Sequence, residues 1–410
     1  MNTSATHLMN LAAITSTAVT SLADTPQVRT VNSQPCVILA SKEVEVAVTQ
    51  LGGHTAPVTF FRDSAKPVQP YHITPWQDEK AGAMPVPVLV PLRGDFFCMP
   101  FGGNSAEVAG EKHPPHGEVA GDAWKVVGTK KAGDVTTLTM GIDTKVRKGS
   151  MTKELSLVDG QNVLYSRHLI EGFAGRVPLG HHATLAMPDK EGSVRIATSA
   201  IRFGMTNPGL FSDPTKREYQ ALLPGSKWKD LTKVPSAWKE APDADLTRLP
   251  ARTGFADLVQ LVNEPWEKTG GPAWITATNA EAGYVWFALK DPAVLNSTIF
   301  WLENRGRHGF PWNGRNNCVG FEDVTAFFAD GLAASTSDNA LTKEGVATAV
   351  QLSADKPTAI NYIQGVVKIP DGFDNVKTLE FAPGSVSFVS TTGKRVTAPV
   401  RHEFIRSGTL

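Results

Sequence analysis

The sequence predicts an all-β protein, a large antiparallel β-sandwich with few short helices. Short runs rich in β-branched and aromatic residues recur along the chain, and in several of them apolar and polar residues alternate. Such alternation is typical of strands in a sheet with one solvated face. The 36 glycines and 28 prolines provide turns between these runs, and long stretches of helical periodicity are scarce.

The predicted strands follow one another along most of the chain. The clearest cover residues 44–53, 134–142, 163–172, 194–204, 283–290 and 386–391. Gly, Pro, Asp and Asn, which favour turns, separate these runs. After the N-terminal region, the best helix candidate covers residues 324–336, a short segment interrupted by Gly331.

The length of 410 residues allows one large domain or two medium ones, since about 150 residues per domain is a common size. β-Sandwiches often exceed that size, so we expect residues 26–410 to form one domain. Residues 1–25 are rich in Ser, Thr and Ala and are expected to form a loose tail or a short helix. Residues 205–272 show little periodicity and predict a long insertion. Insertions of this length often carry function, so this one could wall a site or an interface; a surface insertion without a role is the alternative.

Charge and composition narrow the class of partner. The 40 basic and 40 acidic residues cancel, so nothing favours a nucleic acid or an anionic membrane as partner. A neutral ligand such as a carbohydrate is compatible with this balance. No run approaches 18 apolar residues, and the N-terminal region lacks the basic residues that begin a signal peptide. We therefore expect a cytoplasmic protein, of undetermined oligomeric state.

The three cysteines, Cys36, Cys98 and Cys318, lie far apart without a CxxC spacing. This pattern argues against a disulfide framework and against a zinc site, so we expect buried thiols. The sequence lacks a GxSxG elbow, a P-loop and a GxGxxG motif after a strand. No metal or cofactor is expected.

Histidines gather in three segments of the chain. They are His113, His116, His181, His182 and His308. Histidine can act as an acid or a base near neutral pH. Gly117 suggests a tight turn that would direct His116 into a cleft, although a surface-loop position is the alternative. His181 and His182 lie in or beside a strand, where neighbours point to opposite faces, so at most one of them faces a given site.

Charged and aromatic residues complete the candidate site. Glu322 follows an apolar run, and a carboxylate at such a position is either paired with a cation or functional. Arg93 also follows an apolar run. Three further arginines could bind a phosphate or carboxylate, or pair with nearby acidic residues: Arg305, Arg307 and Arg315. Four aromatic residues could stack on a sugar ring or belong to the core: Trp124, Trp301, Phe310 and Trp312.

The order of these motifs resembles the galactose mutarotase-like (aldose 1-epimerase) superfamily over roughly residues 35–405. That family has an arginine early in the chain, then a histidine followed by glycine with a tryptophan downstream, a second histidine in a strand, and a glutamate that ends a late strand. The matching residues are Arg93, His116-Gly117 with Trp124, His182 in the sequence HHATL, and Glu322 in VGFE.

The resemblance implies a cofactor-independent isomerase that interconverts sugar anomers. Glu322 would be the base, His182 the acid that protonates the ring oxygen, and His116 and Arg93 would hold the ring oxygen and hydroxyls. The remaining candidates for substrate binding are His181, Trp124, Arg307, His308 and Trp312.

Some features depart from the family pattern. Asp323 replaces a proline, HATL replaces an aromatic pair, and the family's additional sugar-binding aspartate has no counterpart that we can place. The sequence therefore resembles a divergent branch. A carbohydrate-binding or regulatory module without turnover, and a glycan lyase or hydrolase on the same scaffold, remain alternatives.

Overall fold

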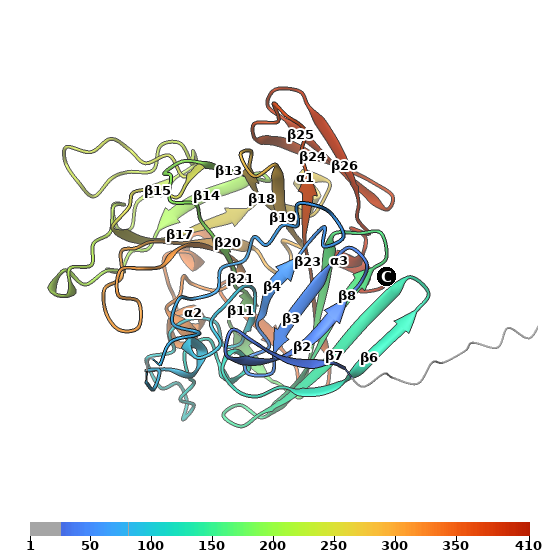
Figure 1. Ribbon diagram of the computed structural model, residues 1–410. Coiled ribbons are helices and arrows are strands. Elements are labelled where there is room, and N and C mark those ends of the chain that lie inside the picture. The colour runs from blue at the N-terminus through green and yellow to red at the C-terminus, as the bar shows by residue number, and fades with distance from the viewer. Residues whose placement is uncertain (1–25, 81) are drawn as a thin grey trace, which may run out of the picture.

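Two large antiparallel sheets dominate the structure, a computed structural model that describes residues 26–80 and 82–410 (Figure 1). The eight-stranded sheet contains β5 (Phe97–Cys98), β11 (Leu179–His181), β12 (Ala183–Ala186), β14 (Ile201–Thr206), β15 (Lys227–Trp228), β17 (Phe255–Asn263), β20 (Ser297–Asn304) and β21 (Asn317–Thr325). Its order is β15-β14-β17-β20-β21-β11-β5, with β12 also paired to β21.

The nine-stranded sheet has the order β16-β13-β18-β19-β23-β9-β8-β7-β6. Its strands are β6 (Lys125–Ala132), β7 (Val135–Thr144), β8 (Gly149–Val158), β9 (Val163–Glu171), β13 (Val194–Thr198), β16 (Arg248–Leu249), β18 (Ala273–Asn279), β19 (Tyr284–Lys290) and β23 (Thr358–Lys368).

Smaller sheets and a few short helices complete the described part of the chain. The small sheets are formed by β1 (Val28–Val31), β2 (Gln34–Ala40), β3 (Glu45–Thr49) and β4 (Thr55–Thr59), by β10 (Gly175–Val177) and β22 (Val350–Leu352), and by β24 (Val376–Ala382), β25 (Ser385–Ser390) and β26 (Arg395–Pro399). The α-helices are α1 (Trp266–Thr269), α2 (Gly331–Thr336) and α3 (Phe404–Ser407), and the short 3-10 turns include η2 (Glu118–Ala120). The prediction of an antiparallel β-sandwich with few short helices is confirmed.

Alternating side chains build three apolar layers. Val259 and Phe300 of the eight-stranded sheet pack toward the nine-stranded sheet, in the core that both sheets share. Leu258 and Trp301, one residue away in each strand, point to the opposite face and pack with the segments around residues 84–101 and 326–346. A third layer lies beneath β24–β26 and α3. Because successive residues in a strand face opposite sides, the eight-stranded sheet buries both of its faces.

Two sequence predictions need correction. Residues 194–204 form two strands, β13 and β14, that belong to different sheets, and the chain crosses between the sheets at residues 199–200. The predicted helix 324–336 is also wrong over its first half. Val324 pairs in β21, and the helix begins only at Gly331.

The insertion expected at residues 205–272 is shorter in the structure. Residues 255–263 form β17, a central strand between β14 and β20, so the irregular part covers about residues 207–254. These loops extend around β15 at the left of Figure 1. β17 was missed because it is buried on both faces, and its sequence FADLVQLVN therefore lacks a regular alternation.

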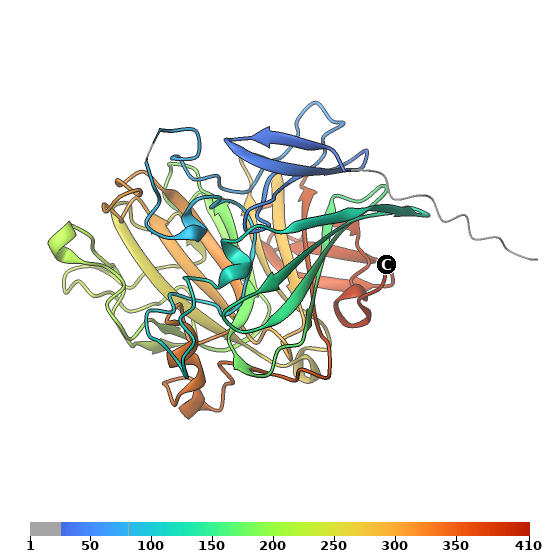
Figure 2. The same ribbon diagram turned by 90° about the horizontal axis from the view of Figure 1, so that it is seen from below.

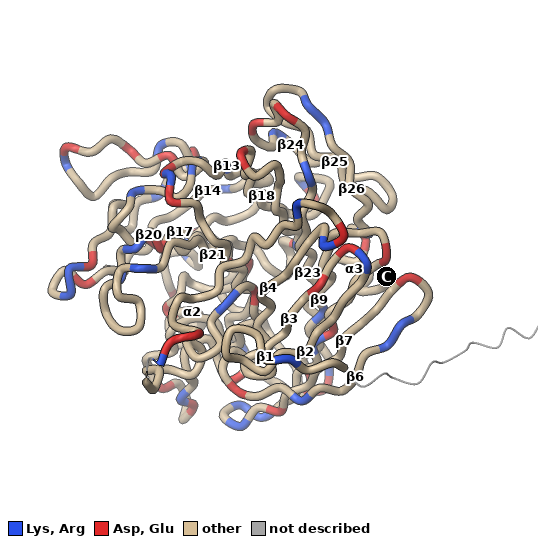
Figure 3. Tube along the Cα trace, viewed as in Figure 1, with Lys and Arg blue, Asp and Glu red and all other residues tan. Residues whose placement is uncertain are grey.

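The remaining features concern the chain as a whole. β2 contacts β7, and Figure 2 shows these segments side by side, so the N-terminal sheet packs onto the large sheets. We propose on this basis that residues 26–410 form one domain; the expected tail at residues 1–25 lies outside the described residues. Basic and acidic residues are interspersed along the loops and hairpins (Figure 3). No helix in the described ranges is long and apolar enough to cross a membrane.

Candidate active site

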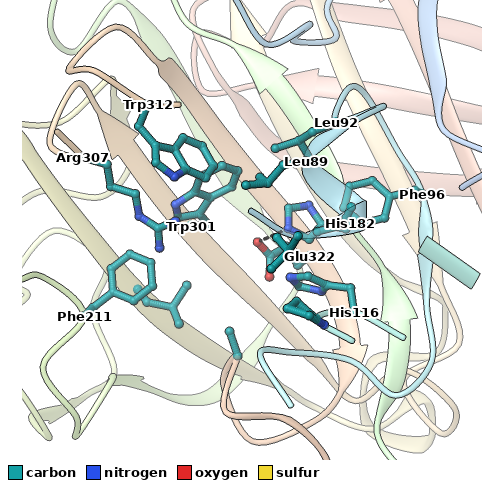
Figure 4. Close-up of a pocket in the computed structure, with 15 residues that line it drawn as sticks. Leu89, Leu92, Phe96, His116, His182, Phe211, Trp301, Arg307, Trp312 and Glu322 are labelled. Carbon is teal, nitrogen blue, oxygen red and sulfur yellow. Dashed lines mark ion pairs between the residues drawn. The ribbon is translucent and has the colours of Figure 1, made fainter. Parts of the chain in front are cut away.

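Three separate segments meet at a cavity of about 230 Å³ on the outer face of the eight-stranded sheet. β21 contributes Glu322, the connection between β11 and β12 contributes His182, and the turn before η2 contributes His116. Figure 4 shows the carboxylate of Glu322 beside the imidazole of His182, with the ring of His116 close by. These three residues are the catalytic group that the sequence predicts, and the fold brings them together at one cavity.

Glu322 is a buried carboxylate with one polar contact. Its Oε1 lies 3.1 Å from Nε2 of His182, and its Oε2 has no hydrogen-bond partner among the described residues. Gly320, on the same face of β21, leaves room for the side chain, because a Cβ there would lie 2.8 Å from Oε1 of Glu322. Burial raises the pKa of Glu322 to about 8, and the nearby cation of Arg307 opposes this shift.

His182 is held on three sides. Its backbone N–H donates to the carbonyl of Phe96 at 2.9 Å, and its ring stacks on the Phe96 ring with centroids 4.5 Å apart. Nδ1 lies 3.2 Å from Oγ1 of Thr184. Burial lowers the pKa of His182 well below its usual value, and the neighbouring His116 adds to this effect. Burial thus disfavours charge on both His182 and Glu322, which favours an uncharged resting pair with its one titratable proton on the carboxyl group of Glu322.

His116 owes its position to an unusual backbone conformation. Its φ of 60° lies in the left-handed region, and Gly117 follows with φ 79°. A Cβ at Gly117 would lie 1.9 Å from the carbonyl oxygen of Met99, so the turn requires glycine there. The His116 ring lies 5.2 Å from that of His182, and its Nδ1 has no hydrogen-bond partner among the described residues. Burial lowers the pKa of His116 to about 4.

Arg307 borders the same cavity within a group of aromatic rings. Its guanidinium carbon lies 4.6 Å from the ring centroid of Phe211, 4.9 Å from Trp312 and 5.7 Å from Trp301. Its nearest carboxylate is Glu303, with Nε and Oε2 3.6 Å apart. Arg305 and Arg315 do not line the cavity and instead pair with Asp189 and Glu79. Of the three arginines in this segment, Arg307 is therefore the one positioned to contact a ligand.

Arg93 does not line the cavity, which corrects the expectation that it binds substrate. The guanidinium is buried, and its N–H groups donate to the carbonyls of Pro91, Val31 and Asn32 at 3.1, 2.9 and 2.8 Å. It also donates to Oε1 of Gln77 at 2.5 Å. Because these contacts occupy the guanidinium, Arg93 holds the turn between β1 and β2 in place.

His181 and Trp124 also lie away from the cavity. His181 faces the core between the sheets, where Nδ1 contacts Oδ2 of Asp95 at 2.9 Å and the ring stacks on Tyr362 at 4.1 Å. Trp124 is buried and donates from Nε1 to the carbonyl of Val119 at 2.9 Å. Both residues therefore stabilise the structure around the site, and neither is placed to bind a ligand there.

His308 and Phe310 occupy the loop that carries Arg307. The backbone N–H of His308 donates to Oε1 of Glu218 at 2.9 Å, and the His308 side chain does not border the cavity. The Phe310 side chain is half exposed beside the cavity residue Trp312. Of the substrate-binding candidates, Arg307 and Trp312 thus border the cavity.

Sequence reasoning missed most of the cavity wall, because that wall is apolar. The missed lining residues are Val86, Val88, Leu89, Leu92, Phe96, Pro115, Phe211, Leu258 and Ala329. Phe96 lies three residues after the candidate Arg93, but its own role carried no distinct signal in the sequence. Leu258 lies in the unrecognised strand β17, and Phe211 in the long irregular segment.

The arrangement provides general acid–base chemistry. A buried carboxyl group and two buried imidazoles lie together at the cavity, and each has a pKa shifted by burial. No set of three or more His, Cys, Asp or Glu side chains in the described ranges could hold a metal ion. The three cysteines are buried free thiols, as predicted.

The chain was compared with known proteins by sequence and by structure. No protein-family model matches the chain, and no curated protein matches its sequence. Several solved structures share its fold. A galactose mutarotase-like protein from Clostridium acetobutylicum is 12% identical, with a TM-score of 0.54 over 84% of this chain and 98% of that chain.

Two further structures agree with this result. A candidate mutarotase from Salmonella typhimurium is 12% identical, with a TM-score of 0.54 over 85% of this chain and 96% of that one. A galactose mutarotase related enzyme from Lactobacillus acidophilus is 11% identical, with a TM-score of 0.50 over 82% and 98%. Identities this low establish the fold and not the activity. The chain therefore shares the fold of galactose mutarotase-like proteins.

Proposed function

We propose that this protein is an isomerase that interconverts the anomers of a sugar by acid–base ring opening. One observation carries the proposal. Glu322 and His182 form a buried pair at 3.1 Å in the cavity, with a second imidazole, His116, 5.2 Å from the first. The volume of about 230 Å³ lies below the roughly 300–1,000 Å³ of pockets for drug-sized ligands. It suits a monosaccharide better than a long glycan.

The single proton of the Glu322–His182 pair sets the first step. Transfer of this proton from Oε1 of Glu322 to Nε2 of His182 produces a carboxylate and an imidazolium without changing the net charge of the cavity. A bound sugar favours this transfer because its hydroxyl groups solvate the two charges that the empty cavity disfavours. The pair then contains the base and the acid that anomerisation needs.

Ring opening uses both groups. The Glu322 carboxylate removes the proton from the anomeric hydroxyl, and the bond between C1 and the ring oxygen breaks as that oxygen takes a proton from His182. The C1–C2 bond of the open aldehyde rotates, and the reverse proton transfers close the ring on its other face. His116, whose Nδ1 has no partner among the described residues, is placed to hold the ring oxygen during these steps. Atoms and charge balance without a cofactor.

Polarimetry tests the proposal. Freshly dissolved α-glucose and α-galactose should reach anomeric equilibrium faster with the native protein, and Glu322→Gln should abolish the acceleration. Glu118→Gln is the matched control, since Glu118 is another buried carboxylate that does not border the cavity. It should keep the activity.

Other outcomes identify other functions. If both sugars raise the melting temperature while their anomers interconvert at the uncatalysed rate, the protein is a carbohydrate-binding module. If neither occurs, a screen with glycans and uronates would test for a hydrolase or lyase on this scaffold.

A further inference from the structure

The cavity is mostly apolar, which is unusual for a site that would bind a fully hydroxylated sugar. Its titratable or charged side chains are His116, His182, Glu322 and Arg307, and the first three form the acid–base group. The indole N–H of Trp301, which has no partner among the described residues, is a further donor in the wall. The rest of the wall is aliphatic or aromatic. A hydroxyl group pressed against such a wall loses its hydrogen bonds to water and gains none in return, which weakens binding.

The central strand β17 illustrates how the wall avoids polar groups. Leu258 points into the cavity opposite Trp301. Asp257, the preceding residue, faces away and accepts the backbone N–H groups of Ala221 and Leu222 at 2.9–3.0 Å. The strand thus places a carboxylate next to the site but uses it to hold a loop.

Gln260 lies on the cavity side of β17 and is also committed elsewhere. Its Nε2 donates to the carbonyl of Ala326 at 2.9 Å, and its Oε1 accepts the N–H of Phe328 at 2.8 Å. Both ends of the amide are thus engaged within the fold, and Gln260 does not line the cavity.

The apolar character continues at two loops next to the cavity. Leu210, which precedes the cavity residue Phe211, is 77% exposed, and Phe310 is 50% exposed. Their loops meet where Glu218 accepts the N–H groups of His308 and Gly309. Exposed apolar side chains on adjoining loops are suited to contact an apolar part of a ligand.

We propose that the ligand is a sugar in which one or more hydroxyls away from the anomeric carbon are replaced or masked by an apolar group. A deoxysugar and an O-alkylated or O-acylated sugar share this chemistry. The inference rests on the proposed function, which places the anomeric carbon at Glu322 and His182. The remaining ring positions then face Leu89, Leu92, Phe96 and Leu258, with the aromatic rings around Arg307 completing the enclosure.

Matched sugar pairs test this proposal. Anomer exchange is followed by NMR, and affinity by calorimetry, for glucose and galactose against their 3-, 4- and 6-deoxy and 6-O-methyl and 6-O-acetyl analogues. At least one analogue should exceed its parent hexose by about 10- to 100-fold in kcat/KM, the range over which an apolar pocket discriminates against an added hydroxyl. Comparison of the deoxy analogues with the O-methyl and O-acetyl analogues then shows whether the ligand lacks a hydroxyl group or carries an apolar substituent on it.

The outcomes separate this inference from the proposed function. Turnover of the parent hexoses at a rate equal to or above all analogues overturns the inference and leaves the isomerase. Tighter binding of an analogue without turnover supports the inference and overturns the isomerase. Absence of turnover and of binding for every sugar overturns both.

Two variants of Leu258 test whether the apolar wall of the cavity causes the preference for the analogues. Leu258→Asn should reduce the analogue-to-parent ratio at least fivefold, while Leu258→Met, which keeps an apolar side chain of similar volume, should preserve it. If Leu258→Asn does not fold, Val88→Thr adds a hydroxyl at nearly constant shape and should act in the same direction. An unchanged ratio in a folded polar variant would contradict the role of the wall.

Discussion

Neighbouring residues on the two faces of the eight-stranded sheet have different surroundings. Asp323 and His181 point into the core between the sheets, and Glu322 and His182, their sequence neighbours, point into the cavity. All four side chains are buried. The comparison therefore separates the effect of burial from the effect of local surroundings.

On the core face, both carboxylate oxygens of Asp323 have partners. Asp323 contacts Nζ of Lys290 at 2.5 Å and accepts hydrogen bonds from the hydroxyls of Thr298 and Tyr362 at 2.6 and 2.7 Å. His181 contacts Asp95. The cavity face, in contrast, gives Glu322 a single partner, His182. A buried carboxylate oxygen without a partner is costly. Oδ1 of Asp95 on the core face also lacks a partner among the described residues, so the contrast concerns Glu322 and Asp323, the two neighbouring carboxylates of β21.

The largest expected effect distinguishes the two carboxylates of β21. Glu322→Gln should reduce kcat by about 10²–10⁴-fold, because it removes the general base. Asp323→Asn should instead destabilise the fold by about 3–5 kcal/mol, because it leaves Lys290 buried without its counter-ion. Steady-state kinetics of both variants measure the loss of kcat, and urea unfolding measures the loss of stability. Comparable kcat losses in two well-folded variants would contradict the division between the faces.

The two histidines should show a similar but smaller contrast. His182→Gln is expected to lower kcat by about 10²-fold while the protein remains folded. His181→Gln should keep kcat and lower stability by about 1–3 kcal/mol, since it disturbs the buried contact with Asp95. His168→Gln is a control, because His168 is buried in the core face and stacks on Phe97 without bordering the cavity.

The pH dependence follows from the single proton of the Glu322–His182 pair. Activity should fall as pH rises above about 8, where Glu322 loses its proton and none remains for the ring oxygen. Folding stability has its own dependence. Between the ordinary pKa of 4.5 and about 8, folded Glu322 holds a proton that the unfolded chain releases, so its contribution to stability is lost as pH rises.

Glu322→Gln isolates that stability contribution. The variant should be more stable than the native protein at pH 9 by roughly 4 kcal/mol, and similar to it at pH 5. Thermal unfolding across this range provides the measurement. A variant that tracks the native protein at every pH would indicate that Glu322 is ionised in the resting state.

The smallest effect concerns Arg307. Arg307→Ala should raise KM by about tenfold, equivalent to about 1.4 kcal/mol of binding, with a smaller change in kcat. Because the Arg307 cation lowers the pKa of Glu322, its removal should also move the alkaline limit of activity to higher pH. Arg305→Ala is the matched control, as Arg305 pairs with Asp189 away from the cavity. It should leave KM and the pH profile unchanged.

The sequence by itself determined the β-sandwich class and the opposite directions of His181 and His182. It also named three residues that the fold brings to one cavity, His116, His182 and Glu322. Alternating runs specify strands because side chains in a strand have a period of two. The same rule required His181 and His182 to face opposite sides. Glu322 and His116 were identifiable because a carboxylate after an apolar run and a histidine before glycine are chemically conspicuous.

The tertiary structure decided which of the other candidates reach the cavity. Arg93, His181 and Trp124 match sequence motifs, yet the fold occupies them with Val31, Asp95 and Val119. Their partners lie up to 86 residues away in the chain, beyond any local pattern.

The tertiary structure also determined which apolar residues form the wall of the cavity. Leu258 and Phe96 resemble any core residue in sequence, because an apolar side chain that contacts a ligand has the same composition as one that contacts another strand. Only the packing of β17, β20 and the segment around residues 86–96 left a space there. The local period of the chain specifies the direction in which a side chain points, and the long-range packing determines what it meets.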